Sequence, residues 1–246
     1  MLRVIEVMNT SVIVVWLTGE HGRRATMIKG AFRPKSMFFG RFDLFYTCEL
    51  LFYSNARSHL HTARECSPLK TRSTFRVDWR ACAAASYCCD LIEKITPWGT
   101  PHPELFSLLD AKLDDLAMNG ATAASLFWFE LRLMMLLGWT PRLNSCSSCG
   151  NALKQRGRDE IFSNEHGGLL CKSCTAVSRE SGRPVSPSAI AMLRCWQQAE
   201  DSKVAGRTRC SPAQTGEICA LLGRFMRYHL DTELRSREIA FEIITE

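Results

Sequence analysis

The sequence predicts an α+β fold in which a small β-domain precedes an α-helical domain. Short β-branched or alternating apolar runs fill the first third of the 246-residue chain, and apolar residues recur at helical spacing from Asp78 onward. Two Cys-x2-Cys pairs interrupt the helical part. We therefore expect a β-domain over residues 1–75 and a helical domain over 76–246, with a cysteine-rich insertion at about 141–178.

The composition is that of a folded protein without a membrane span. Hydrophobic residues make up 46% of the chain, and its length is sufficient to bury a core. The most apolar stretch, 121–139, contains Glu130 and Arg132 and so predicts a buried helix. No apolar signal segment follows Met1, and adjacent thiols such as Cys88-Cys89 suit a reducing compartment. We expect a cytoplasmic protein that is not bound to a membrane.

Five short strands are expected in the first 66 residues. Residues 11–17 form a β-branched run, and residues 24–29 follow at hairpin distance. Over 42–52 every second position is apolar, which is typical of a half-buried strand, and residues 60–65 can return as a fifth strand. This pattern indicates a small five-stranded barrel such as an OB-fold, with an SH3-like barrel as the alternative. The short segment before Ser11 leaves open whether the first strand closes the barrel.

The excess positive charge lies in the β-domain. The formal net charge is +6. Residues 1–75 contain eleven Lys or Arg against five Asp or Glu, whereas residues 76–246 contain twenty of each. Such asymmetry indicates a basic module that faces an acidic partner, most often nucleic acid.

The segment between the third and fourth expected strands combines cations with aromatic rings. Cations bind phosphates and release counterions, and exposed rings stack on bases with little regard to sequence. Phe32, Phe38 and Phe39 can instead fill the barrel core, and the cations can belong to a solvated loop, so both alternatives stay open. The candidate DNA-binding residues of the β-domain are Arg23, Arg24, Lys29, Phe32, Arg33, Lys35, Phe38 and Arg41.

Two thiol pairs, Cys146-Ser-Ser-Cys149 and Cys171-Lys-Ser-Cys174, predict a zinc ribbon. Four sulfur ligands complete a tetrahedron and leave no open position, so we expect one structural zinc ion whose binding free energy belongs to folding. Core cysteines, disulfides and an iron–sulfur cluster are the alternatives. A zinc-dependent nuclease or deaminase would need an open metal position and a nearby general base, and the four thiolates already close the site.

The first two expected helices have opposite surface character. Asp78 can cap a helix whose buried stripe consists of small residues and ends before Pro97. The second helix begins near Pro103 and ends at Asn119-Gly120. Its outer face carries three carboxylates that we expect to be solvated: Asp110, Asp114 and Asp115.

The later helices are expected to form a bundle around residues 122–138, which are apolar on nearly all sides. Glu130 and Arg132 point to different faces of this helix and should pair with other elements. Arg132 is also a candidate for binding a partner. Two more helices are expected at about 188–200 and 212–235.

Four motifs carry a resemblance to a known family. They are Lys29-Gly-Ala-Phe-Arg-Pro-Lys-Ser36, Pro101-His-Pro-Glu-Leu-Phe-Ser-Leu-Leu109, Phe129-Glu-Leu-Arg-Leu133 running on to Gly138-Trp-Thr-Pro141, and Cys146-x2-Cys149 with Gly167-Gly-Leu-Leu-Cys-Lys-Ser-Cys174. In this order they resemble the motifs of the bacterial DNA repair and recombination mediators of the RecO family. Relatives usually carry two consecutive arginines where this chain has Phe32-Arg33.

The resemblance implies an OB-fold, a helical C-terminal domain with an inserted zinc ribbon, and a protein that is neither an enzyme nor a receptor for a small molecule. It implies binding to single- and double-stranded DNA, annealing of complementary strands, and RecA loading with RecR on DNA coated by single-stranded-DNA-binding protein, in the nucleoid of a bacterial cytoplasm. Phosphate contacts would fall to Lys29, Arg33 and Lys35. The alternative is an RNA-binding accessory factor of translation or transcription. The surfaces that would bind RecR or the single-stranded-DNA-binding protein, and the oligomeric state, do not follow from the sequence.

Overall fold

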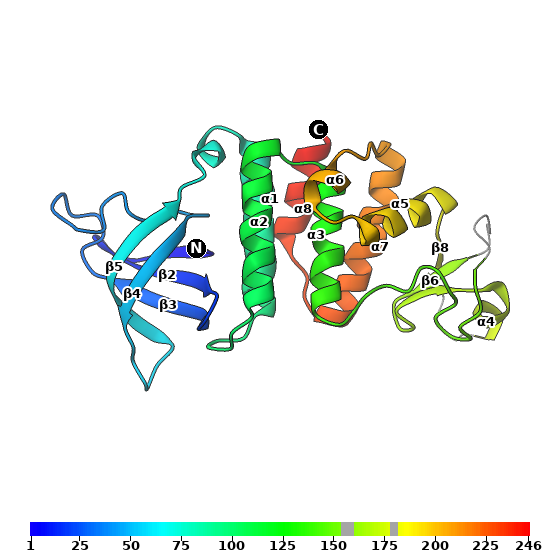
Figure 1. Ribbon diagram of the computed structural model, residues 1–246, viewed down its shortest axis with the longest axis horizontal. Coiled ribbons are helices and arrows are strands. Elements are labelled where there is room, and N and C mark those ends of the chain that lie inside the picture. The colour runs from blue at the N-terminus through cyan, green and yellow to red at the C-terminus, as the bar shows by residue number, and fades with distance from the viewer. Residues whose placement is uncertain (154–159, 178–181) are drawn as a thin grey trace. The chain divides into compact units, whose positions relative to one another are not determined.

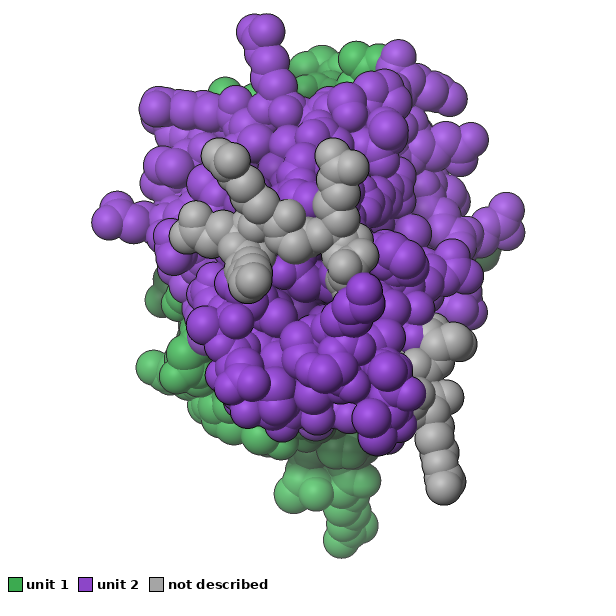
Figure 2. Space-filling model, turned by 90° about the vertical axis from the view of Figure 1, so that its right-hand side faces the viewer, with its two compact units in different colours: residues 1–120 green, residues 121–246 purple. Residues whose placement is uncertain are grey.

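A computed structural model describes residues 1–153, 160–177 and 182–246. The described chain is α+β and forms two compact units, residues 1–120 and residues 121–246, which are coloured separately in Figure 2. The first unit contains a five-stranded sheet and the two helices that follow it, and the second contains the remaining helices and a small three-stranded sheet (Figure 1). The domain boundary near residue 75 stays a prediction.

The five-stranded sheet has the order β1-β2-β3-β5-β4. Only the β3–β5 pair is parallel. The edge strands β1 and β4 do not pair with each other, so the barrel is not closed, in agreement with the partly open five-stranded barrel of an OB-fold. The strands are β1 (Arg3–Met8), β2 (Ser11–Thr18), β3 (Gly22–Ile28), β4 (Thr47–Tyr53) and β5 (Leu60–Lys70).

The core of the sheet follows the alternation of β2. Val12, Val14 and Trp16 point to the same face and are buried, and the Trp16 indole Nε1 donates a hydrogen bond to the Thr26 hydroxyl at 2.9 Å. The aromatic side chain of Phe38, from the segment between β3 and β4, completes this core. Apolar burial therefore orders part of a segment that has no strand structure of its own.

The alternation predicted over 42–52 begins later than expected. Phe45 adopts a left-handed conformation with a φ of 67°, and its ring packs edge-on against Phe75 at 5.0 Å between centroids. Phe45 and Tyr46 are consequently both buried, although they are neighbours in sequence. A period of two cannot continue through such a reversal, so β4 starts only at Thr47.

Two long helices complete the first unit, after the short 3-10 helix η1 (Ser73–Arg76). Helix α1 (Trp79–Ile95) begins as predicted, because the Asp78 side chain accepts a hydrogen bond from the backbone NH of Ala81. It packs on α2 (Pro103–Asn119). The fully buried alanines of α1, among them Ala81, allow the helices to approach closely.

The second unit is built around α3 (Ala123–Leu136), as the sequence predicts. Every residue of α3 from 124 to 131 is buried, and Figure 1 shows this helix among those that pack on it. The other helices are α4 (Lys172–Val177), α5 (Pro187–Gln198), α6 (Ser202–Gly206), α7 (Pro212–Leu230) and α8 (Arg235–Thr245). The small sheet consists of β6 (Ile161–Ser163), β7 (Gly168–Leu170) and β8 (Arg183–Pro184) in the order β7-β6-β8. No helix of the described residues has the length and apolar character that a membrane span requires.

Candidate nucleic-acid interface and metal centre

The segment between β3 and β4 begins with a chain of tight turns, which we call the basic loop (residues 29–41). Gly30 opens it with a φ of 64°, a conformation that favours glycine. The backbone NH groups of Arg33, Ser36, Phe39 and Arg41 each donate to the carbonyl three residues earlier, at 2.9–3.1 Å. Buried Ala31 and Phe38 anchor the loop to the sheet. The other side chains are thereby directed outward from a defined backbone.

Three cations of the basic loop lie around one hollow. Lys29, Arg33 and Lys35 are all exposed, and none of them forms an ion pair with a carboxylate of the described residues. The hollow is lined by Val7, Ser11, Met27, Lys29, Gly30, Arg33, Lys35 and Ser36. Uncompensated cations around a concave surface attract an anion, and phosphate groups are suitable ligands. Arg41 is exposed at the far end of the same loop.

The three phenylalanines of the basic loop divide between surface and core. Phe32 and Phe39 are 47% and 62% exposed, so their rings can meet a base. Phe38 is only 7% exposed and belongs to the core, which corrects its assignment as a DNA-binding ring. Met37, which the sequence did not single out, is also 62% exposed.

Arg23 and Arg24 lie at the other end of β3. Six residues of extended chain separate Arg23 from Lys29, which corresponds to about 20 Å. The Arg23 guanidinium lies 4.1 Å from the centre of the Trp98 ring and donates to the Glu93 carbonyl, and its partial burial lowers its pKa. The Arg24 Nη1 atom lies 3.4 Å from His61. The structure therefore does not bring these arginines together with the cations of the basic loop.

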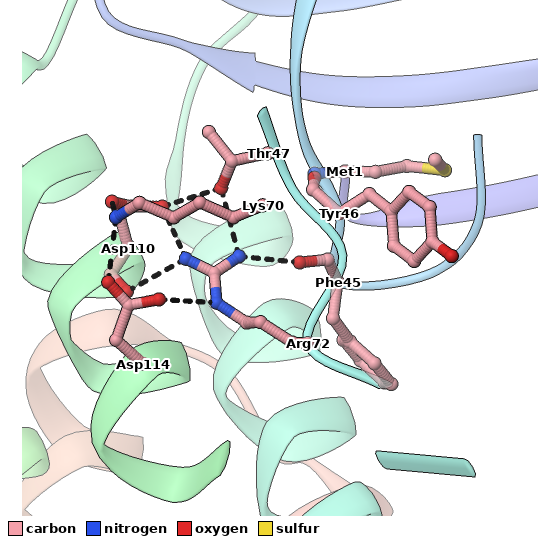
Figure 3. Close-up of polar contacts among 8 residues, drawn as sticks. All are labelled: Met1, Phe45, Tyr46, Thr47, Lys70, Arg72, Asp110 and Asp114. Carbon is pink, nitrogen blue, oxygen red and sulfur yellow. Dashed lines mark hydrogen bonds and ion pairs between the residues drawn. The ribbon is translucent and has the colours of Figure 1, made fainter. Parts of the chain in front are cut away.

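A charge network around the buried Arg72 holds the C-terminal end of the segment between β3 and β4, and the sequence analysis did not predict it (Figure 3). Arg72 has a side chain that is only 3% exposed. It donates to the Phe45 carbonyl at 2.7 Å and to the Thr47 hydroxyl at 2.9 Å. Its other nitrogens contact Asp110 at 2.6 Å and Asp114 at 2.7 Å. Arg72 thus fixes the chain reversal at Phe45 and the start of β4.

Lys70 completes what we call the Arg72 cluster (Lys70, Arg72, Asp110 and Asp114). Its ammonium group lies 2.6 Å from Asp110 and 2.7 Å from Asp114. Burial alone would raise the pKa of Asp110, but its hydrogen bonds with Lys70, Thr47 and Arg72 prevail and hold it at about 2. The expectation that the acidic face of α2 is merely solvated is wrong. Asp115 likewise pairs with the buried Lys112 at 3.1 Å.

The four predicted ligands converge in the second unit. The sulfur atoms of Cys146, Cys149, Cys171 and Cys174 all lie within 4.8 Å of one another, and those of Cys149 and Cys171 are 3.8 Å apart. A metal–sulfur distance of about 2.3 Å places tetrahedral sulfurs about 3.8 Å apart, so the spacing fits one metal ion. All twelve cysteines lie in the described part of the chain, and none of them forms a disulfide in this structure.

The backbone forms the two knuckles that the spacing predicts. In the first, the Gly150 NH donates to the Cys146 carbonyl at 2.9 Å, and Gly150 takes a φ of 76°. In the second, Cys171 directly follows β7, and its NH donates to the Cys146 sulfur at 3.4 Å. The Ser173 hydroxyl lowers the pKa of Cys171 to about 6. Residues 154–159 and 178 of the predicted ribbon lie outside the described residues.

The two polar residues of α3 have different environments. Glu130 is fully buried and forms an ion pair with Arg237 of α8 at 2.7 Å, as expected of a residue that pairs with another element. The Arg132 guanidinium instead lies over the ring of Trp128 in its own helix, 5.6 Å from its centre. A role for Arg132 in binding a partner stays a prediction.

Comparisons with known proteins cover both parts of the chain. Residues 1–72 match the family model described as Recombination protein O N terminal, and residues 76–238 match Recombination protein O C terminal. A protein of Roseiflexus sp. named DNA repair protein RecO is 31% identical over 87% of this chain and 74% of its own length. Two proteins of the same name are also similar. The one from Myxococcus xanthus is 30% identical over 94% of this chain and 90% of its own length, and the one from Desulfitobacterium hafniense is 31% identical over 88% of this chain and 78% of its own length.

Proposed function

The chain belongs to the RecO family of DNA repair and recombination proteins, and from this membership we propose that it is a non-catalytic, DNA-binding mediator. In this proposal it binds single- and double-stranded DNA, anneals complementary strands and, with RecR, assists the loading of RecA on DNA coated by single-stranded-DNA-binding protein. It acts in the bacterial cytoplasm, at the nucleoid. Its task is to bind and position strands, so no bond in the DNA is made or broken.

The observation that carries the proposal is the basic loop. Lys29, Arg33 and Lys35 surround a hollow without carboxylate partners among the described residues, and the exposed rings of Phe32 and Phe39 belong to the same loop. Phosphates would bind the cations and release counterions, while the rings would stack on bases without reading their identity. Such a surface suits a protein that must accept any sequence.

The four-cysteine cluster supports the proposal as a structural element. Its sulfurs can hold one metal ion, and four thiolates are the ligand set typical of structural zinc. When bound, zinc supplies a cross-link between the two knuckles and no open coordination position. Cys146 and Cys171 would then fix the segment before β6 to the one after β7.

The test compares the salt dependence of DNA binding between two triple variants of the full, zinc-loaded chain. In the first, Lys29, Arg33 and Lys35 are each replaced by Ala. In the matched control, three exposed cations elsewhere in the first unit are replaced by Ala: Arg57, Arg80 and Lys94. Affinity for a 20-nucleotide dT strand is measured by fluorescence anisotropy over a range of salt concentrations.

The loop variant should bind more weakly, and the slope of log affinity against log salt concentration should become less steep by about 2. Each lost phosphate contact removes about 0.7 from this slope. The control should keep the slope of the unmodified protein. Salt-independent binding, or equal losses in both variants, would contradict the proposal. Preference for RNA over DNA of the same sequence would favour an RNA-binding accessory factor, and a pull-down with RecR and single-stranded-DNA-binding protein tests the proposed partners.

A further inference from the structure

Two arginines without a carboxylate partner among the described residues lie in the second unit, where the small sheet packs on α7. Phe162 of β6 contacts Phe225 of α7 with 5.6 Å between ring centres, and the ring of His229, one turn further along, contacts the backbone of Asn164. Strand β6 therefore runs beside the face of α7 that carries these two aromatic residues. Strand β8 lies on one side of β6 and pairs Arg183 with Phe162.

This packing brings Arg183 and Arg224 near each other, because Arg183 lies opposite Phe162 and Arg224 adjoins Phe225, the residue that Phe162 contacts. Arg224 precedes Phe225 on α7, so its side chain emerges about 100° around the helix from the packed face. Burial lowers the pKa of Arg224, and the charge of Arg183 lowers it further, in agreement with this placement. Arg183 is exposed and Arg224 is half-buried, and neither forms an ion pair with a carboxylate of the described residues.

Two neighbouring cations, of which Arg224 is half-buried, repel each other. A bound anion would offset this cost, because it accepts hydrogen bonds from both guanidinium groups. Tyr228 follows Arg224 by one helical turn and so shares its face of α7. Its ring is 55% exposed. The combination places a flat aromatic surface about 6 Å along the helix from Arg224.

We propose that this surface, the ribbon seam (Arg183, Arg224 and Tyr228), binds a second single strand of nucleic acid. Arg183 and Arg224 hold one backbone phosphate, and Tyr228 stacks on an adjacent base. The seam belongs to a different compact unit from the basic loop, so one chain would carry two strands. The inference rests on the proposed function only in identifying the polyanion as nucleic acid.

The experiment measures strand bridging and single-strand affinity separately. Donor-labelled and acceptor-labelled dT strands cannot anneal to each other, so energy transfer between them reports binding to one protein at the same time. The double variant Arg183→Glu/Arg224→Glu is compared with a matched charge reversal, Arg207→Glu/Arg209→Glu, at exposed sites in the same unit. Zinc content and thermal melting of each full-length variant show whether the ribbon still packs on α7.

The seam variant should lose bridging about tenfold, whereas its affinity for one dT strand changes less than threefold because the basic loop is intact. Tyr228→Leu, which leaves the charges unchanged, should weaken bridging about fivefold. Unchanged bridging, or an equal loss in the Arg207/Arg209 control, would overturn the inference. Tighter binding of polyglutamate than of dT at the seam would also overturn it, in favour of an acidic protein. If the basic-loop variant loses all binding of dT, this result bears on the proposed function of the basic loop and not on the ribbon seam.

Discussion

The Arg72 cluster of the first unit and the four-cysteine cluster of the second hold irregular segments by different chemistry. In the Arg72 cluster two cations face two carboxylates, so the charges compensate one another within the chain. In the cysteine cluster four sulfurs converge within 4.8 Å of one another, so ionised thiols would repel. The first cluster is complete by itself, whereas the second requires a cation, and the two should therefore respond to different perturbations.

Removal of the metal should have the largest effect and should be confined to the second unit. Structural zinc contributes about 10–16 kcal/mol of apparent binding free energy, which becomes folding free energy of the ribbon. Chelation, or the substitution Cys146→Ser, should release zinc and expose the amides of β6 and β7 to hydrogen exchange. Amides of β2 and β3 in the first unit should keep their protection, because the Arg72 cluster contains no metal.

Cys195→Ser is the matched control for this experiment, since Cys195 is an exposed thiol of the same unit outside the cluster. It should retain one zinc per chain. If zinc is absent from the unmodified protein, or if Cys146→Ser exchanges no faster than Cys195→Ser, the comparison between the clusters fails. Iron with visible absorbance in place of zinc would change the identity of the metal and leave the ligands unchanged.

The substitution Arg72→Met should destabilise the first unit by about 3 kcal/mol. It removes the buried partner of two carboxylates and leaves the Phe45 carbonyl without its donor, although Asp110 and Asp114 keep Lys70 and some contact with water. Urea unfolding measures the loss, and Arg57→Met, at an exposed cation, is the control. A loss below 1 kcal/mol would show that the cluster adds little net stability.

The sequence predicts those features whose causes lie close together along the chain. The Asp78 cap depends on an NH three residues away, and each cysteine knuckle on a turn of four residues, so spacing alone identified both. By contrast, Arg72 meets Asp110 38 residues later in the chain. No local pattern distinguishes a carboxylate that pairs with an arginine far away in the sequence from one that faces water. The prediction that the carboxylates of α2 are solvated was wrong for this reason.

The candidate interface was predictable in composition but not in geometry. Its cations were evident from charge counting, because Lys29 and Arg33 stand in a basic segment. Which phenylalanine is buried depends on the turns of the basic loop, and these place Phe38 inside and Phe39 outside. The reversal at Phe45 is another tertiary effect, since its left-handed backbone is stabilised by Arg72 and Phe75.

The smallest expected effect concerns the exposed member of the Arg72 cluster. Lys70 has a side chain that is 42% exposed, so Lys70→Met should cost only about 0.5–1 kcal/mol at neutral pH. The more informative measurement is its pH dependence. Asp110 has a pKa of about 2 in the folded protein against an ordinary 3.8, so its contribution is complete above pH 3.8 and is lost as the pH falls through 2.

Without Lys70, the pKa of Asp110 should rise toward 3.8, because the largest hydrogen-bond contribution that lowers it is gone. The free energies of unfolding of the two proteins should therefore differ at pH 5 and converge as the pH falls through 2, because the carboxyl becomes protonated in both proteins only below that pH. Urea unfolding between pH 2 and 5 measures this convergence, with Lys94→Met of α1 as the control for loss of an exposed lysine. A difference in the free energy of unfolding that stays constant with pH would mean that Lys70 acts through packing. The second unit, which contains the four-cysteine cluster, should have the same stability in the Lys70→Met and Lys94→Met variants at each pH.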